Sequence, residues 1–455
     1  MGTCMINSSP MGFPHGSLSR REFFRSALLT GAGLSINPIM RVWGTQQSAV
    51  PDRLLVTLQL DGGVDATMLC DPKVNVTGEP KINHWADLSE VEQVGNIQYA
   101  PVASNRSLFE RYGSDMLVIN GVDSQTNSHE TGKLFNWTGA NSEGQPSISA
   151  LFAAAQAPGQ PLAYSVFGGL SRTAGIIGYN RFDDLAVLRG LTQPNVQPWS
   201  GEMKRWGSEI QRAQRAVDKE SARMLNTNVS LREQQSLERF NSARESRKDL
   251  AALADLIPAE EDIVQREDFN AGGMMFSSNL KQQMQSALLV FQSGLGVAAD
   301  LSLGGFDSHD ENEPIQEALL SHLYEALNFF WDTADSLGLA DRILLVIGSD
   351  FGRTNFINET NGKDHWPIGS YILMEQGAPW GNRVVGVTDS LHFAEKIDPL
   401  TLKASKNGIF LTPSNIHKAV REYLGIEQFA IDSGFDLAAV QSIPFFDLFS
   451  SPMGS

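Results

Sequence analysis

The chain has 455 residues, of which 42% are hydrophobic and 19% are charged, and its formal net charge at pH 7 is −17. This composition is typical of a globular protein rather than a disordered one. The acidic balance argues against a nucleic-acid partner and against an anionic membrane surface, because both require a basic footprint on the protein. Beyond the N-terminal segment no long apolar run is present, so we expect no stable membrane span in the mature protein.

The N-terminal segment has the pattern of an export signal. Arg20 and Arg21 lie in the sequence Ser-Arg-Arg-Glu-Phe-Phe-Arg, and a weakly apolar run over residues 26–40 follows. This pattern is typical of a signal read by the twin-arginine translocase, and the alternative is a basic first helix. We therefore assign residues 1–49 to a signal and linker, and we expect the protein in the periplasm or outside the cell.

From residue 50 to residue 455 the sequence indicates a single α/β domain. An aliphatic run without polar alternation predicts a buried strand at residues 343–347, and other apolar stretches predict strands at residues 53–60, 115–121, 297–303 and 371–374. Amphipathic spacing with capping residues predicts helices at residues 279–292, 314–337 and 412–423. The alternation of strands and helices predicts a largely parallel sheet with helices on both faces. We also expect the strand at 115–121 to lie next to the strand at 53–60.

Residues 201–260 differ from the rest of the domain. Charged residues are frequent there, apolar residues recur at helical spacing, and no strand-like run is present. This pattern predicts one or two long, exposed helices with a solvated charged face. We interpret the segment as a helical insertion over the loops of the sheet, where it would shape a substrate pocket.

Side chains that could bind a metal or take part in catalysis lie directly after the predicted strands and at the start of a helical segment. In open α/β sheets ligands bind beyond the carboxyl ends of the strands, so we expect these side chains to lie close together. They are Asp61, Ser128, His129, Asp307, His309, Asp350, Asp364 and His365. In an extended loop alternate residues point to one side, so Asp307 and His309 can converge on one ion.

The combination of carboxylates and imidazoles without thiolates suits a divalent metal. Nitrogen ligands favour Zn or Mn, whereas Mg and Ca remain alternatives. The sequence therefore predicts one or two ions. The predicted metal ligands are Asp61, Asp307, His309, Asp350, Asp364 and His365.

Several of these positions have a second interpretation. The Asp61-Gly-Gly sequence is also typical of a plain turn, and Ser128 is either a nucleophile or a helix cap. Arg353 either binds an anionic oxygen of a substrate or pairs with a carboxylate. We interpret the remaining histidines past the signal and the cysteine at position 70 as structural; these histidines are His84, His322, His392 and His417.

The order of these motifs resembles that of the DUF1501 family. The matching segments are Asp61-Gly-Gly, Ser128-His129, Gly-Phe-Asp307-x-His309, Ser-Asp350-Phe-Gly-Arg353 and Gly-x-Asp364-His365. That family is uncharacterised, consists largely of bacterial proteins exported by the twin-arginine pathway, and is related to the alkaline phosphatase and sulfatase superfamily. The resemblance implies a three-layer sandwich like that of alkaline phosphatase.

The resemblance also implies roles for single residues. Asp61 resembles the superfamily's first metal ligand, Asp307 and His309 resemble the next pair, and His365 resembles the final histidine. Asp350 resembles the aspartate of an Asp-His pair, but Phe351 stands where the paired histidine would be. A single residue separates Asp307 from His309, whereas the superfamily has three.

The resulting prediction is an exported, metal-dependent hydrolase of phosphate or sulfate esters, carried by a small molecule or a polymer. Ser128 would attack the phosphorus or sulfur, His129 would be a ligand or a general base, and Arg353 would hold the anionic oxygens. The alternative is a non-catalytic binding or assembly protein of the cell envelope that retains the fold and a metal.

Overall fold

The computed structural model describes residues 52–447, except for residues 169, 182–184, 194, 198–201, 206, 226–229, 231–232, 234–236, 238–249, 251–252 and 438. The predicted signal and linker at residues 1–49 lie outside the described residues, as does part of the predicted insertion at 201–260. The described residues all belong to one compact unit, Trp43–Ser455.

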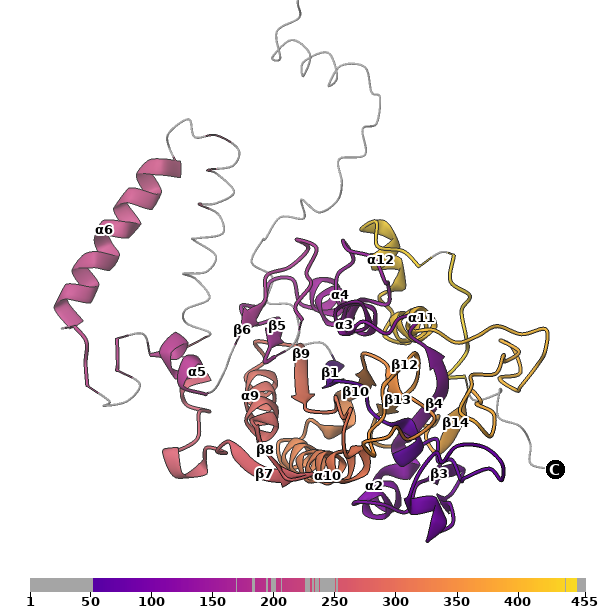
Figure 1. Cartoon of the computed structure of the whole chain (residues 1–455). Coiled ribbons are helices and arrows are strands. Elements are labelled where there is room, and N and C mark those ends of the chain that lie inside the picture. Colours follow the sequence, from indigo (N-terminus) through magenta and orange to yellow (C-terminus); the bar gives the residue numbers. More distant parts are fainter. Residues whose placement is uncertain are drawn as a thin grey trace, which may run out of the picture. The chain divides into compact units, whose positions relative to one another are not determined.

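An eight-stranded sheet forms the centre of this unit (Figure 1). In spatial order its strands are β14 (Arg383–Val385), β4 (Met116–Asp123), β13 (Ile368–Met374), β10 (Ile343–Ser349), β1 (Leu54–Asp61), β9 (Ala298–Gly304), β5 (Tyr164–Val166) and β6 (Asn180–Arg181). Strand β13 is antiparallel to both of its neighbours, and every other pair of neighbours is parallel. The predicted α/β fold with a largely parallel sheet is confirmed.

Strand β1 lies between β10 and β9 and is buried along nearly its whole length. Leu54 pairs with Ile343 at its start, and Leu60 pairs with Ser349 near its end. A strand with parallel neighbours on both sides and helices on both faces meets no water, so every residue from Leu54 to Leu60 is buried, including the polar Thr57 and Gln59. Asp61 pairs with Gly304, so the loops that leave β1, β9 and β10 begin at the same edge of the sheet.

The expected pairing of β4 with β1 is wrong, because β10 and β13 lie between these two strands. Strand β4 pairs with β13 on one side and with β14 on the other. An aliphatic run shows that a strand is buried, but it carries no information about which of several equally apolar strands will pair with it.

Helices cover both faces of the sheet and complete three layers (Figure 1). One layer contains α3 (His129–Thr138), α4 (Ile148–Gln156), α11 (Pro413–Tyr423) and α12 (Glu427–Asp432), and the other contains α2 (Asn105–Tyr112), α9 (Leu280–Gln292) and α10 (Asn312–Ser336). Thr412 and Asn415 form a capping box at the start of α11, which agrees with the helix predicted from residue 412. Gly338, with φ of +66°, follows the end of α10.

The remaining elements lie outside the central sheet. Three two-stranded sheets are formed by β2 (Glu92–Val94) with β3 (Ile97–Tyr99), β7 (Glu267–Ala271) with β8 (Met274–Ser278), and β11 (Gly352–Arg353) with β12 (His365–Trp366). Two further helices are α5 (Leu185–Thr192) and α6 (Gly207–Leu225), and α6 falls in the predicted insertion. Among the helices that the structure describes, none is both long and apolar enough to cross a membrane.

Candidate metal centre

Four loops at the carboxyl edge of the sheet carry the candidate site. Asp307 and His309 lie in the loop between β9 and α10, and Asp350 follows β10. His365 lies on β12, opposite Arg353 of β11. The fourth loop runs from β4 to α3, whose first residue is His129.

Gly62 allows the loop after β1 to approach the loop of Asp307. Its φ is +114°, and a Cβ atom added there would lie 2.5 Å from the backbone nitrogen of Asp307. Only glycine fits both the backbone angle and this space. The Gly62 N–H also donates to Oδ1 of Asp350 over 3.1 Å. The Asp-Gly-Gly sequence therefore makes a close approach between two loops, and not only a turn.

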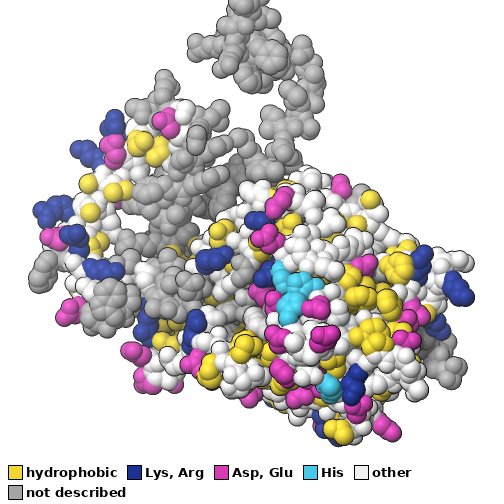
Figure 2. Space-filling model, viewed as in Figure 1, with side chains coloured by type: hydrophobic (Ala, Val, Ile, Leu, Met, Phe, Trp, Pro, Cys, Tyr) yellow, Lys and Arg dark blue, Asp and Glu magenta, His cyan; other side chains and the backbone are white. Residues whose placement is uncertain are grey.

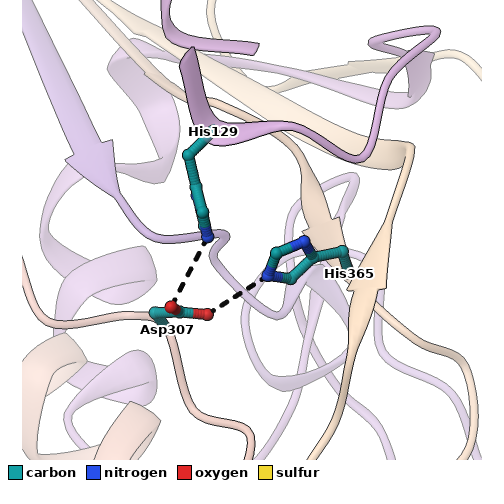
Figure 3. A group of neighbouring side chains, drawn as sticks. All are labelled: His129, Asp307 and His365. Carbon is teal, nitrogen blue, oxygen red and sulfur yellow. Dashed lines mark ion pairs between the residues drawn. The ribbon is translucent and has the colours of Figure 1, made fainter. Parts of the chain in front are cut away.

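Asp307 is the centre of a cluster that it forms with three histidines, called here the His–Asp cluster. Nε2 of His309 lies 3.0 Å from Oδ1 of Asp307, and Nε2 of His365 lies 3.4 Å from the same atom. Nε2 of His129 lies 3.5 Å from Oδ2. Figure 3 shows His129 and His365 pointing toward the Asp307 carboxylate from two sides. All three histidines thus present the same ring nitrogen to one carboxylate.

The other ring nitrogen of each histidine meets an oxygen. Nδ1 of His129 lies 2.5 Å from Oδ2 of Asp350, and Nδ1 of His309 lies 2.8 Å from Oδ1 of Asp364. Nδ1 of His365 lies 2.8 Å from the carbonyl oxygen of Asn127. A carbonyl oxygen only accepts hydrogen bonds, so Nδ1 of His365 carries the proton. We assign the same tautomer to the other two rings, which leaves the Nε2 lone pairs facing the cluster.

This arrangement fits a divalent cation. Nε2 of His309 lies 3.1 Å from Nε2 of His365, and two lone pairs repel at that distance unless a cation lies beside them. Nε2 of His129 is buried and has no hydrogen-bond partner among the described residues. In metalloproteins the ring nitrogen of a ligand histidine that does not bind the metal typically donates to a hydrogen-bond acceptor. Nδ1 of each cluster histidine has such an acceptor. Three imidazoles and one carboxylate suit Zn or Mn better than Mg or Ca.

Arg353 is fully buried and holds Asp307 in place. Its guanidinium donates to Asp307 and to the carbonyl oxygens of Gly62, Gly63 and Lys363. Burial alone would raise the pKa of Asp307, but the hydrogen bond and charge of Arg353, together with the charges of His129 and His309, keep that pKa below its ordinary value. The structure therefore favours the carboxylate-pairing alternative for Arg353 over the binding of a substrate oxygen.

Asp350 and Asp364 lie behind histidines of the cluster. The Asp350 carboxylate is buried and accepts from Gly62, from the Ser349 hydroxyl over 3.0 Å and from His129. The hydrogen bond to Asp350 is the main reason why the pKa of His129 is raised. Asp364 has the same relation to His309, although it is exposed. Both carboxylates thus contact the outer nitrogen of a cluster histidine instead of the shared centre.

Asp61 pairs with a lysine that the sequence reasoning missed. Lys133 Nζ lies 3.3 Å from Oδ1 of Asp61. Burial raises the pKa of Asp61; Lys133 opposes this shift, and the nearby Asp350 charge adds to it. Lys133 is four residues after His129 on α3, so both residues lie on one face of that helix. This spacing was available in the sequence as a signal.

Ser128 occupies the N-cap position of α3, but its side chain makes no capping hydrogen bond. It is exposed, and its backbone N–H donates to the Thr126 hydroxyl over 3.1 Å. Ser128 thus directly precedes the first histidine of the cluster in the chain. Cys70 is buried, and burial raises the pKa of its thiol to about 12, so it has no nucleophilic character. The other described histidines lie outside the His–Asp cluster; they are His84, His322, His392 and His417.

The His–Asp cluster is open to solvent. The side chains of Asp307 and His309 are 47% and 45% exposed. Figure 2 shows histidine side chains gathered on one face of the compact unit, with acidic side chains around them. A ligand can therefore reach the centre from outside.

Comparison with solved structures returns distant likenesses. A structure from work on the metabolism of multiple glycosaminoglycans by Bacteroides thetaiotaomicron is 10% identical, with 87% of this chain and 76% of that chain covered and a TM-score of 0.40. A sulfatase from Pseudoalteromonas sp. is 10% identical, with 87% and 70% covered and a TM-score of 0.37. A protein in the alkaline phosphatase superfamily from Vibrio parahaemolyticus is 8% identical, with 83% and 68% covered and a TM-score of 0.37.

A search of curated proteins gave no match. A family model described as "Protein of unknown function (DUF1501)" matches residues 52–405. The chain belongs to the DUF1501 family.

Proposed function

We propose that this protein is an exported, metal-dependent hydrolase of phosphate or sulfate esters. The observation that carries the proposal is the convergence of three Nε2 atoms on the Asp307 carboxylate, with an acceptor behind each ring. Lone pairs that face one another repel, so holding these three nitrogens together on an exposed surface does not stabilise the fold by itself. The arrangement is instead typical of a site for a cation.

The His–Asp cluster would hold one divalent cation, Zn or Mn, through His129, His309, His365 and Asp307. When bound, the cation supplies a positive charge that polarises a phosphoryl or sulfuryl oxygen and lowers the pKa of a neighbouring hydroxyl. Asp307 supplies the negative ligand, and Arg353 keeps it ionised. Asp350 and Asp364 hold two of the imidazoles in the ligand tautomer.

Ser128 is the proposed nucleophile. Its hydroxyl is exposed at the start of α3, next to His129, where the helix N-terminus favours negative charge. Its oxygen would form a bond to phosphorus or sulfur while the bond to the ester's alcohol breaks, and water would later release phosphate or sulfate and restore the serine. Lys133, one turn further along α3, would attract the anionic oxygens of the ester.

A second candidate function is a binding or assembly protein of the cell envelope that keeps the metal for structure. One observation favours it: Arg353 is buried and bonds to Asp307 and to backbone carbonyls, so it is not free to hold an ester. The two candidates share the metal and differ in the role of Ser128.

The deciding experiment measures turnover of aryl phosphate and aryl sulfate esters by zinc- and manganese-loaded protein, wild type against Ser128→Ala. The hydrolase proposal expects turnover by the wild type and a fall of at least about a hundredfold in the variant, since the nucleophile is lost. Ser142→Ala, at an exposed serine in the segment after α3, is the control and should keep turnover. Metal binding without turnover of any ester would leave the binding protein as the better candidate.

A further inference from the structure

A buried ion pair lies beneath the His–Asp cluster. Lys363 Nζ lies 2.7 Å from Oδ2 of Asp65, and neither side chain is exposed. The ammonium also donates to Oγ1 of Thr67 over 3.1 Å and to Oδ1 of Asn83 over 3.0 Å. All three ammonium hydrogens therefore have an acceptor, and these hydrogen bonds fix the orientation of the Lys363 ammonium relative to Asp65.

Such a pair is not explained by stability alone. Bringing two charges out of water costs about as much as their attraction returns, and apolar residues of the same size often serve as well. A fully satisfied buried network instead fixes the relative position of the segments that contribute to it. The location of the pair shows which segments these are.

Lys363 directly precedes Asp364 and His365, and its backbone connects two loops. Its N–H donates to the Ser308 carbonyl over 3.1 Å, and its carbonyl accepts from Arg353 over 3.0 Å. Ser308 lies between Asp307 and His309. The segment with one ligand is thus bound to the segment with two.

Asp65 holds the same loop from the other side. Its Oδ2 accepts from Nδ2 of Asn312 over 2.8 Å, and Oδ1 of Asn312 accepts from the Ser308 hydroxyl over 2.7 Å. Gln316 adds a hydrogen bond to the same hydroxyl over 3.0 Å. Both ligand-bearing loops are therefore connected to one carboxylate that lies outside the cluster.

We propose that Lys363 and Asp65 are positioning residues that set the distance of His365 from Asp307 and His309 and thereby the affinity for the metal. The inference rests on the proposed function, because it assumes that the His–Asp cluster binds a cation. It assigns a role to two residues that touch neither the metal nor a substrate.

The test is a double-mutant cycle on the full chain with Lys363→Met, Asp65→Asn and both together. Zn²⁺ affinity is measured by competition with a chelating dye, and unfolding is measured separately in urea. Each single variant leaves a buried group without its partner and should lose stability. The double variant has no uncompensated charge and should regain stability, yet it should bind Zn²⁺ at least about tenfold more weakly than the wild type.

Arg421→Met is the matched control. Arg421 lies on α11 and is an equally buried cation, and its Nη1 donates to the Phe435 carbonyl. It should lose stability and keep the wild-type Zn²⁺ affinity. A double variant with wild-type affinity would overturn the inference and leave the metal centre intact. A wild type that binds no Zn²⁺ or Mn²⁺ would overturn the metal centre and this inference together.

Discussion

His309 and His365 bring their Nε2 atoms within 3.1 Å of each other, while Nδ1 of each ring is turned to an oxygen acceptor. The acceptors place the ring protons on the outer nitrogens, so two lone pairs and the Asp307 carboxylate share a small space. This is an electrostatic arrangement that a cation stabilises, and it is specific enough to test by substitution.

Metal content is the first prediction. Protein purified without added metal should contain about one equivalent of Zn or Mn, since the ligand atoms of His129, Asp307 and His365 lie within 4.8 Å of one another and His309 contacts Asp307. His309→Ala and His365→Ala should each remove most of it, as measured by elemental analysis. His84→Ala is the control, because His84 is exposed and lies outside the cluster. Unchanged metal content in both cluster variants would place the ion elsewhere.

The carboxylates behind the histidines should control affinity without being ligands. Asp364→Asn should weaken Zn²⁺ binding by about ten- to a hundredfold, because an amide can offer an N–H to Nδ1 of His309 and reverse its tautomer. A dye-competition titration measures the change. Since Asp364 is exposed, the variant should unfold at the wild-type urea concentration. Complete loss of the metal would instead indicate direct ligation by Asp364.

Gly62→Ala should disturb the cluster through the backbone. The new methyl group would lie 2.5 Å from the backbone nitrogen of Asp307, at a φ that L residues rarely adopt. Gly78→Ala has a similar φ of +90° and no atom within 4 Å, so it reports the backbone strain alone. We expect Gly62→Ala to lose about 1 to 3 kcal/mol more unfolding free energy than Gly78→Ala. It should also weaken Zn²⁺ binding, and equal effects in both variants would contradict this.

The pH dependence of the unfolding free energy between pH 4 and pH 7 should contain a contribution from Asp300. Burial raises the pKa of this β9 residue to about 6, although hydroxyl groups of Ser149, Tyr164 and Thr57 oppose the shift. The folded state therefore favours the protonated acid, and the stability this gives below about pH 4 is lost as pH rises through about 6.

Asp300→Asn removes that titration. The stability of the wild type relative to the variant should fall by up to about 3 kcal/mol between pH 4 and pH 7, as measured by urea unfolding at each pH. Ser286→Ala removes a buried hydroxyl and no titrating group, so it is the control and should keep the wild-type slope between pH 4 and 6. A difference between wild type and Asp300→Asn that does not depend on pH would show that Asp300 ionises normally.

Export should depend on the arginine pair. Replacing both Arg20 and Arg21 by Lys should leave the protein in the cytoplasm, because the translocase reads the pair itself and not the charge. Cell fractionation followed by immunoblotting measures the distribution. Arg25→Lys is the control: it changes a nearby arginine but leaves Arg20 and Arg21 in place, so this variant should be exported. Normal export of the double variant would favour the interpretation of this segment as a basic helix.

Local signals in the sequence predicted much of the fold. The apolar stretches correspond to β1, β4, β9 and β10, because a strand that meets no water consists mainly of apolar residues, with few buried polar ones such as Gln59 and Asp300. The Thr-Pro start of α11 and the glycine after α10 marked helix ends, since caps act within a few residues. The same locality explains why Asp307, His309 and His365 were recognised as candidates.

The sequence did not show which residues far apart in the chain contact each other. The order of the strands, with β13 antiparallel between β10 and β4, depends on a choice among similar apolar surfaces. The relation of Asp350 to His129 joins residues 221 positions apart, and no local pattern separates a carboxylate that binds a metal from one that orients its ligand.

The sequence by itself determined which residues are candidates for a site and at which edge of the sheet they lie. Only the tertiary structure decided their roles: Asp307 at the centre, three imidazoles around it, Asp350 and Asp364 behind them, and Arg353 buried against Asp307. The physical reason is that residue type and strand position follow from local hydrophobicity. The role of a charged side chain depends on which groups surround it in three dimensions and on how far they exclude water.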